Sequence, residues 1–391
     1  MKKLLVGLLV IVRSWCQTGD IREFFRASME HQSEEDLKYS SFSPSFFNDL
    51  ELVFWPELGP RIVRLGKLLS QRHYSVIYTL VGIKSVVIKY EVHCSGNDDT
   101  IHGLVREFWF MRRLSVLNIT PKPIFLSPPT KFENYHSSKL DFTISGQERR
   151  NCLNNPQSEV RYMLTSRALG SLFDRIIISM ELEIEIPFIR SIDAILDIVE
   201  HLSLMYTAGI IHTSIDPSNI VEMSSGNSDD RNNYRLIGFG SAVYRAEQAN
   251  FADIINTNLT SVKCFNSHFE MEGYRSSFRD DIYRAVFSIS FFSQGVAGGK
   301  QFIKFCQSLE DEPEELLRWK SNHFWFEVPG GLSMADRLPS KLTSIEKSEI
   351  RNLLEKILDK TRSSIQGTEI DDPPEFDDIV YYATQIKQIL K

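Results

Sequence analysis

The sequence lacks several features that mark whole classes of protein. Its five cysteines include no Cys-x-x-Cys pair, which argues against a structural zinc site. It has no basic block, and Asp and Glu outnumber Lys and Arg by 51 to 44, so nucleic acid is not expected as a partner. No apolar run reaches the roughly 20 residues that a membrane-spanning helix needs. No segment repeats at a period of roughly 20–50 residues, which argues against a solenoid.

The composition that is present is that of a globular protein. Of the 391 residues, 42% are hydrophobic and 24% are charged, which excludes disorder, collagen and coiled coil as descriptions of the whole chain. This length fits two or three lobes built around one or two cores.

The predicted secondary structure changes along the chain. Short β-rich runs occupy the part from Arg61 to Tyr90, notably Ser75–Leu80 and Ser85–Tyr90. Helical periodicity dominates most of the rest. The predicted helices cover Gly103–Leu117, Ser191–Ala208, Asp280–Phe292 and Ile345–Lys360. A β-rich part followed by a helical part predicts an α+β protein with two lobes.

The first residues have the form of a secretory leader. Lys2 and Lys3 precede an apolar run from Leu4 to Val12, and Ser14-Trp15-Cys16 offers a loose cleavage site. The alternative is an N-terminal strand or an interfacial helix, which Arg13 directly after the run favours. We expect a signal peptide over residues 1–16 and a secreted or lumenal protein.

Cleavage at that site would leave four cysteines. In an oxidising compartment they allow two disulfides with three possible connectivities, and four buried free thiols are equally compatible with the spacing. The four are Cys94, Cys152, Cys264 and Cys306.

The most informative motifs lie in the second half of the chain. The stretch His212-Thr213-Ser214-Ile215-Asp216-Pro217-Ser218-Asn219 resembles the protein kinase catalytic loop, HRDxxxxN. Gly238-Phe239-Gly240 resembles the metal-binding turn, DFG. Upstream, Val86-Val87-Ile88-Lys89 resembles the VAIK strand, and Glu107 lies on the next predicted helix, where the family places the carboxylate that pairs with the lysine.

Three further stretches are similar to the casein kinase 1 group. Leu65–Tyr78 resembles its nucleotide loop, Ser277–Tyr283 resembles its Arg-Asp-Asp helix entry, and Asp372–Ile379 resembles its terminal Pro-Asp-Tyr stretch. The resemblance covers about Arg61 to Lys391, with degraded motifs in the expected order.

This resemblance implies a bilobal protein kinase-like fold with a β-rich N-lobe and a mostly helical C-lobe. The expected domain covers residues 59–391, with the N-lobe at about 59–165 and the C-lobe at about 170–391. Residues 17–58 are then an accessory segment, and the polar stretch 128–158 is an insertion.

The chemical groups of an active kinase are missing from the matching positions. Ser214 stands where the family has the aspartate that accepts the substrate proton, and Gly238 stands where it has the Mg²⁺-binding aspartate. No metal site is therefore expected, with Asn219 as a remnant only. Asp216 replaces the usual catalytic-loop lysine and brings negative charge there.

The nucleotide-binding positions are also altered. Lys89, Glu107 and Asn219 remain, and the pair of Lys89 with Glu107 can contact nucleotide or be structural only. The family's three phosphate-loop glycines are replaced, and Arg72 either offers a cation to phosphate or fills the space. The replacing residues are Ser70, Arg72 and Ser75. Arg167 and Leu169 lie in a stretch that resembles the hinge whose backbone meets adenine.

The sequence therefore predicts a pseudokinase that acts by binding or scaffolding an unknown protein, with no required cofactor and only weak, Mg²⁺-independent ATP binding. One alternative is an atypical Ser/Thr kinase with residual phosphotransfer that uses Asp216 as base. Another is a nucleotide sensor that binds ATP without metal.

Roles are also predicted for several flanking residues. His212 is expected to pack and hydrogen-bond near the metal-binding turn, and Asp281 to accept backbone N–H groups of the catalytic loop. Asp280 is predicted to be a solvated neighbour. A short strand with a solvated acidic face is predicted around three alternating glutamates, Glu181, Glu183 and Glu185.

Overall fold

The computed structural model describes a large part of the chain in two compact units. The first unit is residues 1–112 with 122–167, and the second is residues 113–121 with 168–391. The described residues are 50–55, 59–71, 75–93, 103–131, 158–224, 234–245, 265–266, 276–296, 299–300, 313–327, 333–366 and 375–391. The expected leader, residues 17–49 of the accessory segment, Arg72 and most of the insertion lie outside these residues.

The described part of the first unit contains a seven-stranded antiparallel sheet with the strand order β1-β2-β3-β4-β7-β5, and β6 pairs with β7. Its strands are β1 (Leu50–Trp55), β2 (Gly59–Gln71), β3 (Ser75–Leu80), β4 (Ile83–His93), β5 (Pro123–Leu126), β6 (Thr130–Lys131) and β7 (Glu159–Ser166). Strand β1 pairs along its whole length with β2. The sheet therefore begins within the segment that the sequence assigned to an accessory region.

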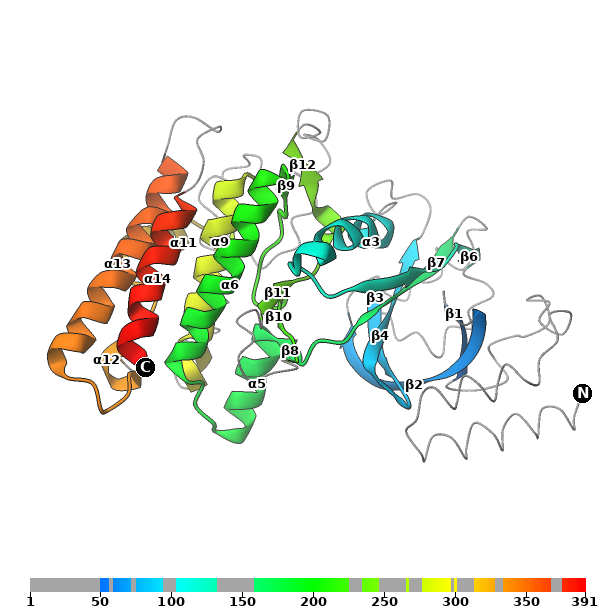
Figure 1. Cartoon of the computed structure of the whole chain (residues 1–391), viewed down its shortest axis with the longest axis horizontal. Helices are drawn as coiled ribbons and strands as arrows, with labels where there is room; N and C mark the ends of the chain where they lie inside the picture. Colours follow the sequence, from blue (N-terminus) through cyan, green and yellow to red (C-terminus); the bar gives the residue numbers. More distant parts are fainter. Residues whose placement is uncertain are drawn as a thin grey trace, which may run out of the picture. The chain divides into compact units, whose positions relative to one another are not determined.

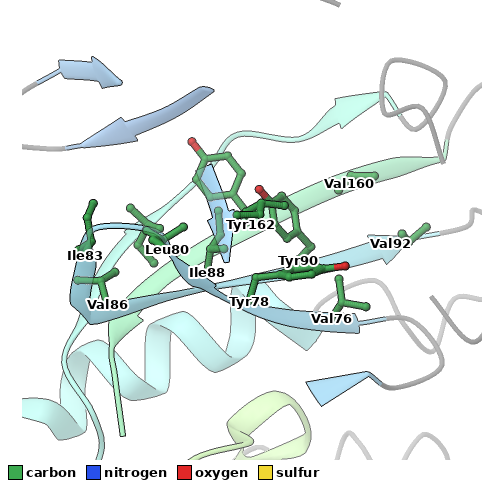
Figure 2. Packing of buried hydrophobic residues seen from close by; sticks show 12 residues of the cluster. Val76, Tyr78, Leu80, Ile83, Val86, Ile88, Tyr90, Val92, Val160 and Tyr162 are labelled. Carbon is green, nitrogen blue, oxygen red and sulfur yellow. The ribbon is translucent and has the colours of Figure 1, made fainter. Parts of the chain in front are cut away.

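The core of this sheet follows from strand alternation. Successive side chains of a strand point to opposite faces, so every second residue of β3 is buried, from Val76 through Tyr78 to Leu80. Strand β4 places Ile88 and Tyr90 in the same cluster, which strand β7 completes (Figure 2). These β-branched and aromatic side chains suit a pleated, buried surface.

Helix α3 (Gly103–Leu114) is joined to β4 by a carboxylate. The Glu91 side chain accepts a hydrogen bond from the Leu104 backbone N–H at 2.9 Å and so satisfies one of the free donors in the first turn of the helix. Burial raises the pKa of Glu91 above its ordinary value. A short 3₁₀ turn over Ser115–Leu117 extends α3. Together the two cover the helix predicted over Gly103–Leu117.

The second unit is mainly helical (Figure 1). Its helices are α5 (Leu172–Leu182), α6 (Phe188–Thr207), α9 (Phe278–Phe292), α11 (Pro313–Asn322), α12 (Met334–Arg337), α13 (Ser344–Gln366) and α14 (Phe376–Leu390). Helix α6 packs against α9, and α14 packs against both α6 and α13. Every residue of α9 is buried, as expected of a helix at the centre of a helical unit.

Short strands connect these helices. They are β8 (Gly170–Ser171), β9 (Ile210–Ile211), β10 (Ile220–Glu222), β11 (Tyr234–Leu236) and β12 (Val243–Tyr244). Strand β10 lies between β11 and β8, and β12 pairs with β9. These pairings fix both ends of the segment that contains the predicted catalytic loop.

The predicted α+β class is confirmed, with a sheet in the N-terminal part and helices in the C-terminal part. The strand predicted around Glu181, Glu183 and Glu185 is wrong, because α5 runs to Leu182. Within the described ranges, no helix is both long and apolar enough to span a bilayer.

Candidate functional site

The loop from His212 to Asn219 is attached to helix α9 by one buried carboxylate. The two oxygens of Asp281 accept hydrogen bonds from the backbone N–H groups of His212, at 2.6 Å, and Thr213, at 2.9 Å. Asp281 is only 1% exposed. The predicted role of Asp281 is confirmed, and this contact fixes the start of the loop.

Arg284, one turn further along α9, contacts the same part of the loop. The sequence analysis did not single it out. Its guanidinium donates to the Thr213 carbonyl and, at 3.2 Å, to the Asn266 side-chain oxygen. Thr213 has a φ of 68°, a left-handed conformation that is unfavourable for a β-branched residue. Asp281 and Arg284 thus bind the backbone N–H and the backbone carbonyl of this strained residue. The Asp-x-x-Arg spacing, which puts both on one helix face, is the signal that could have found Arg284.

Asp280 was predicted to be solvated, and this prediction is wrong. The residue is buried and its carboxylate accepts hydrogen bonds from the backbone N–H of Ser277, at 2.6 Å, and from its hydroxyl, at 2.5 Å. The Ser277 hydroxyl in turn accepts from the Asp280 backbone N–H. This capping box begins α9 and gives Asp280 a structural role, beside that of Asp281 in holding the loop.

His212 is held in one tautomer by two backbone groups. Its Nε2 lies 2.9 Å from the Ile237 carbonyl oxygen, and its Nδ1 accepts a hydrogen bond from the Ser214 backbone N–H at 3.3 Å. Nε2 therefore carries the proton, and the ring is neutral. Burial lowers the pKa of His212 to about 4. The ring also packs on Phe239 at 4.5 Å between centroids, which confirms the predicted structural contacts.

Ser214 and Asp216 both serve the conformation of the loop. The Ser214 carbonyl accepts a hydrogen bond from the Asn219 side-chain amide at 2.7 Å. One oxygen of Asp216 accepts from the Ser218 backbone N–H at 2.7 Å and from the Ser218 hydroxyl at 2.5 Å. Such bonds from an aspartate to the residue two positions on are typical of an Asx turn. One of the two carboxylate oxygens of Asp216 is thus used within the turn.

Gly238 and Asn219, the two positions that the sequence analysis compares with a kinase metal site, lie next to each other. Gly238 has a φ of 82°, and a Cβ atom built on it would lie 2.6 Å from the Asn219 side-chain oxygen. The Asn219 amide nitrogen is bonded to Ser214. Mg²⁺ prefers carboxylate and phosphate oxygens, so these groups do not fit it. The part of the chain that the structure describes holds no group of three His, Cys, Asp or Glu residues placed to bind a metal.

This crowding predicts that Gly238→Ala destabilises the second unit by about 3 kcal/mol, from left-handed strain of about 1–2 kcal/mol and from the displaced Asn219 side chain. Gly209→Ala is the matched control, because Gly209 also has a positive φ, 68°, and its Cβ would meet nothing within 4 Å. Urea unfolding should give the control a loss of about half as much or less. Equal losses for the two variants would contradict the contact with Asn219.

In the first unit, Lys89 and Glu107 form an ion pair between β4 and α3. The Lys89 nitrogen lies 2.5 Å from a Glu107 carboxylate oxygen, and their side chains are 17% and 6% exposed. Lys89 and Glu91 lie two positions apart on the same strand. The strand thus contacts α3 at two successive turns, through Leu104 and Glu107. The predicted pairing of Lys89 with Glu107 is present in the structure.

The ion pair gives a second prediction. Lys89→Met is expected to lower the free energy of unfolding by about 2 kcal/mol, because it leaves the Glu107 carboxylate buried without its partner. The double variant Lys89→Met/Glu107→Leu should recover most of this loss, since it removes both charges. Urea unfolding of the two single variants and the double variant forms the required cycle. Additive losses would show that the two side chains do not interact.

The remaining predicted positions contribute mainly backbone. Ser70 pairs with Ile77 across an irregular β2–β3 ladder, and Ser75 begins β3. Arg72 between them lies outside the described residues. The Arg167 N–H donates to the Ser85 carbonyl in the first unit, and the Leu169 N–H donates to the Glu222 carbonyl in the second, at 2.8 and 2.7 Å.

Comparison with known proteins does not extend this description. The chain matches no protein-family model. No curated protein matches it either. The argument for function therefore rests on the geometry of the chain itself. Its described groups can hold a loop rigidly and pair charges across a strand and a helix, while Asn219 and Gly238, the two positions compared with the kinase metal site, carry no carboxylate.

Proposed function

We propose that this chain is a pseudokinase of the casein kinase 1 type, with a bilobal kinase-like fold, and that it acts by binding another protein. The observation that carries the proposal is the contact of Gly238 with Asn219. Where a kinase needs a carboxylate for Mg²⁺, this chain has no side chain, and Asn219 fills the adjacent space.

The side chains of Ser214 and Asp216 in the loop support the same conclusion. A catalytic base must have a free acceptor within reach of the substrate hydroxyl. Ser214 carries no charge, and Asp216 uses an oxygen within its own turn. General-base catalysis typically contributes about 10²–10⁴-fold, and the uncharged Ser214 cannot supply it as an aspartate does.

The contacts that hold the scaffold are nevertheless complete. Asp281 and Arg284 fix the loop, and the ion pair joins β4 to α3. A chain that keeps the supports of a kinase loop without its chemistry is suited to present a surface. We further propose that the protein works in the secretory pathway or after secretion, on the basis of its leader-like first residues.

Nucleotide binding is a second candidate, and the intact pair of Lys89 with Glu107 favours it. In kinases this pair orients the lysine toward the nucleotide phosphates. Here it would act without Mg²⁺, so the bound nucleotide would serve as a ligand and not as a substrate.

A melting experiment on the full chain separates these functions. The protein is heated with and without ATP, each with and without Mg²⁺, and Lys89→Met serves as the control. A ligand that binds only the folded state stabilises it by about 2.7 kcal/mol at a hundredfold excess over its Kd. We expect either no shift or a Mg²⁺-independent shift that Lys89→Met abolishes. A Mg²⁺-dependent shift together with transfer of labelled phosphate to a protein substrate would overturn the proposal.

A further inference from the structure

Helix α5 carries apolar side chains on two opposite faces. Leu172 and Ile176 are buried and hold the helix in the second unit. Ile178 and Leu182, one turn apart, are 44% and 61% exposed. At 100° per residue Ile178 lies about 160° and Leu182 about 120° from Ile176 around the helix axis. A helix on the surface of a unit normally carries polar residues on its outer face, so this face lacks the expected composition.

The chain continues the exposed surface beyond the helix. Glu183 ends α5 with a φ of 54°, and Ile184 donates its backbone N–H to the Ser179 carbonyl at 3.0 Å. Ile184 is itself 58% exposed. The acidic-apolar patch is defined by Ile178, Glu181, Leu182, Glu183 and Ile184. It occupies the end of α5 and the turn that follows, before α6 (Figure 1).

Glu181 and Glu183 give the patch two exposed carboxylates. Among the described residues, none forms an ion pair with Glu181 or Glu183. The arginines nearest in sequence are already paired, because Arg175 and Arg190 both contact the Glu222 carboxylate, at 2.9 and 3.5 Å. A ligand of this patch therefore meets exposed aliphatic side chains beside uncompensated negative charge.

We propose that the acidic-apolar patch binds a short segment of a partner protein in which Lys or Arg alternates with aliphatic residues. This inference rests on the proposed protein-binding function and names its surface. The aliphatic side chains of the segment would cover Leu182 and Ile184, while its cations would lie against Glu181 and Glu183. Two other occupants fit worse. A second copy related by a two-fold axis would face glutamate with glutamate, and an anionic lipid surface would be repelled.

The test uses a labelled amphipathic peptide of Lys and Leu, with an otherwise identical peptide of Glu and Leu as the control ligand. Fluorescence anisotropy with the full chain at low salt should give micromolar binding of the basic peptide only. Glu181→Lys/Glu183→Lys and Leu182→Ser/Ile184→Ser should each weaken binding about tenfold or more, since both charge and apolar contacts contribute.

Matched controls come from helix α13. Ile345 is 78% exposed and Glu349 is exposed, so Ile345→Ser and Glu349→Lys repeat the same chemical changes elsewhere in the second unit. They should change binding by no more than about twofold. Absence of binding, equal binding of both peptides, or equal loss in the control variants would overturn the proposal. A concentration-dependent dimer that the patch variants abolish would overturn it in favour of a second copy.

The same protein sample is assayed for phosphotransfer. Transfer of phosphate overturns the proposed pseudokinase whatever the peptide result is. Failure of the peptide to bind, with no transfer, overturns only the assignment of this surface. The two proposals therefore fail separately.

Discussion

Asp281→Ala is expected to lower the free energy of unfolding by about 4 kcal/mol. The substitution leaves the backbone N–H groups of His212 and Thr213 without their acceptors inside the second unit. A hydrogen bond to a charged group contributes about 1.5–3 kcal/mol, and a buried donor left unpaired costs its desolvation as well. Thr213 would also lose one of the three bonds that hold it in its left-handed conformation, and those with Arg284 and Ser241 would remain.

Asp377→Ala is the matched control for this prediction. Asp377 is also an aspartate in the first turn of a helix, α14, but it is exposed. The control measures the general effect of a carboxylate at a helix N-terminus, about 0.3–1 kcal/mol. Urea unfolding compares the two variants. If Asp281→Ala lowers the free energy of unfolding by no more than Asp377→Ala does, the role assigned to Asp281 is wrong.

Asp281→Asn refines the same test. The amide keeps one oxygen acceptor but turns an NH₂ group toward the second backbone N–H. We expect its loss to fall between those of the wild type and Asp281→Ala, at about 2 kcal/mol. If Asp281→Asn and Asp281→Ala lower the free energy of unfolding equally, a hydrogen bond to a single backbone N–H does not measurably stabilise the protein.

The sequence predicted those parts of the fold that depend on local periodicity. Ser75–Leu80 shows the period of two, and Ser191–Ala208 shows the helical period, and both elements formed close to their predicted ends. The segment around Glu181, Glu183 and Glu185 was assigned the wrong element. Its alternating glutamates imitate a strand, but the buried contacts of Leu172 and Ile176 extend the helix into it.

The candidate site was predictable where it depends on residue type. The absence of a carboxylate at Ser214 and at Gly238 can be read from their identities alone. The role of Asp216 could not be predicted from the sequence, because it depends on which neighbouring residue forms a hydrogen bond with its side chain. Asp280 and Asp281 show the same limit. They are chemically identical neighbours, and only their directions on α9 decide that one caps its helix while the other holds the loop.

The second large effect concerns acid stability. Burial lowers the pKa of both His212 and His201 from 6.5 to about 4. Nδ1 of the buried His201 ring has no hydrogen-bond partner among the described residues, and the charge of Arg235 further disfavours its protonation. Each histidine is therefore neutral in the folded protein over a pH range in which the unfolded chain binds a proton.

The sign of the effect follows from this difference. Between pH 6.5 and about 4 the unfolded state holds more protons, so the free energy of unfolding falls as the pH falls, and above pH 6.5 the contribution is constant. Each histidine accounts for a loss of about 3 kcal/mol over this range. Glu91 acts in the opposite direction, since its pKa is raised and its protonation favours the folded state.

Urea unfolding at a series of pH values between 7 and 4 measures this slope. His212→Gln should be less stable at pH 7, because it loses the ring contact with Phe239, yet its stability should fall less steeply as the pH falls. His201→Gln should also reduce the slope, and the double variant should lose the histidine contribution and keep only the opposite one from Glu91. A variant that keeps the full wild-type slope would show that its histidine already carries a proton in the folded protein. For His212 that result would contradict the hydrogen bond from Ser214 to Nδ1, because a protonated ring has no acceptor to offer.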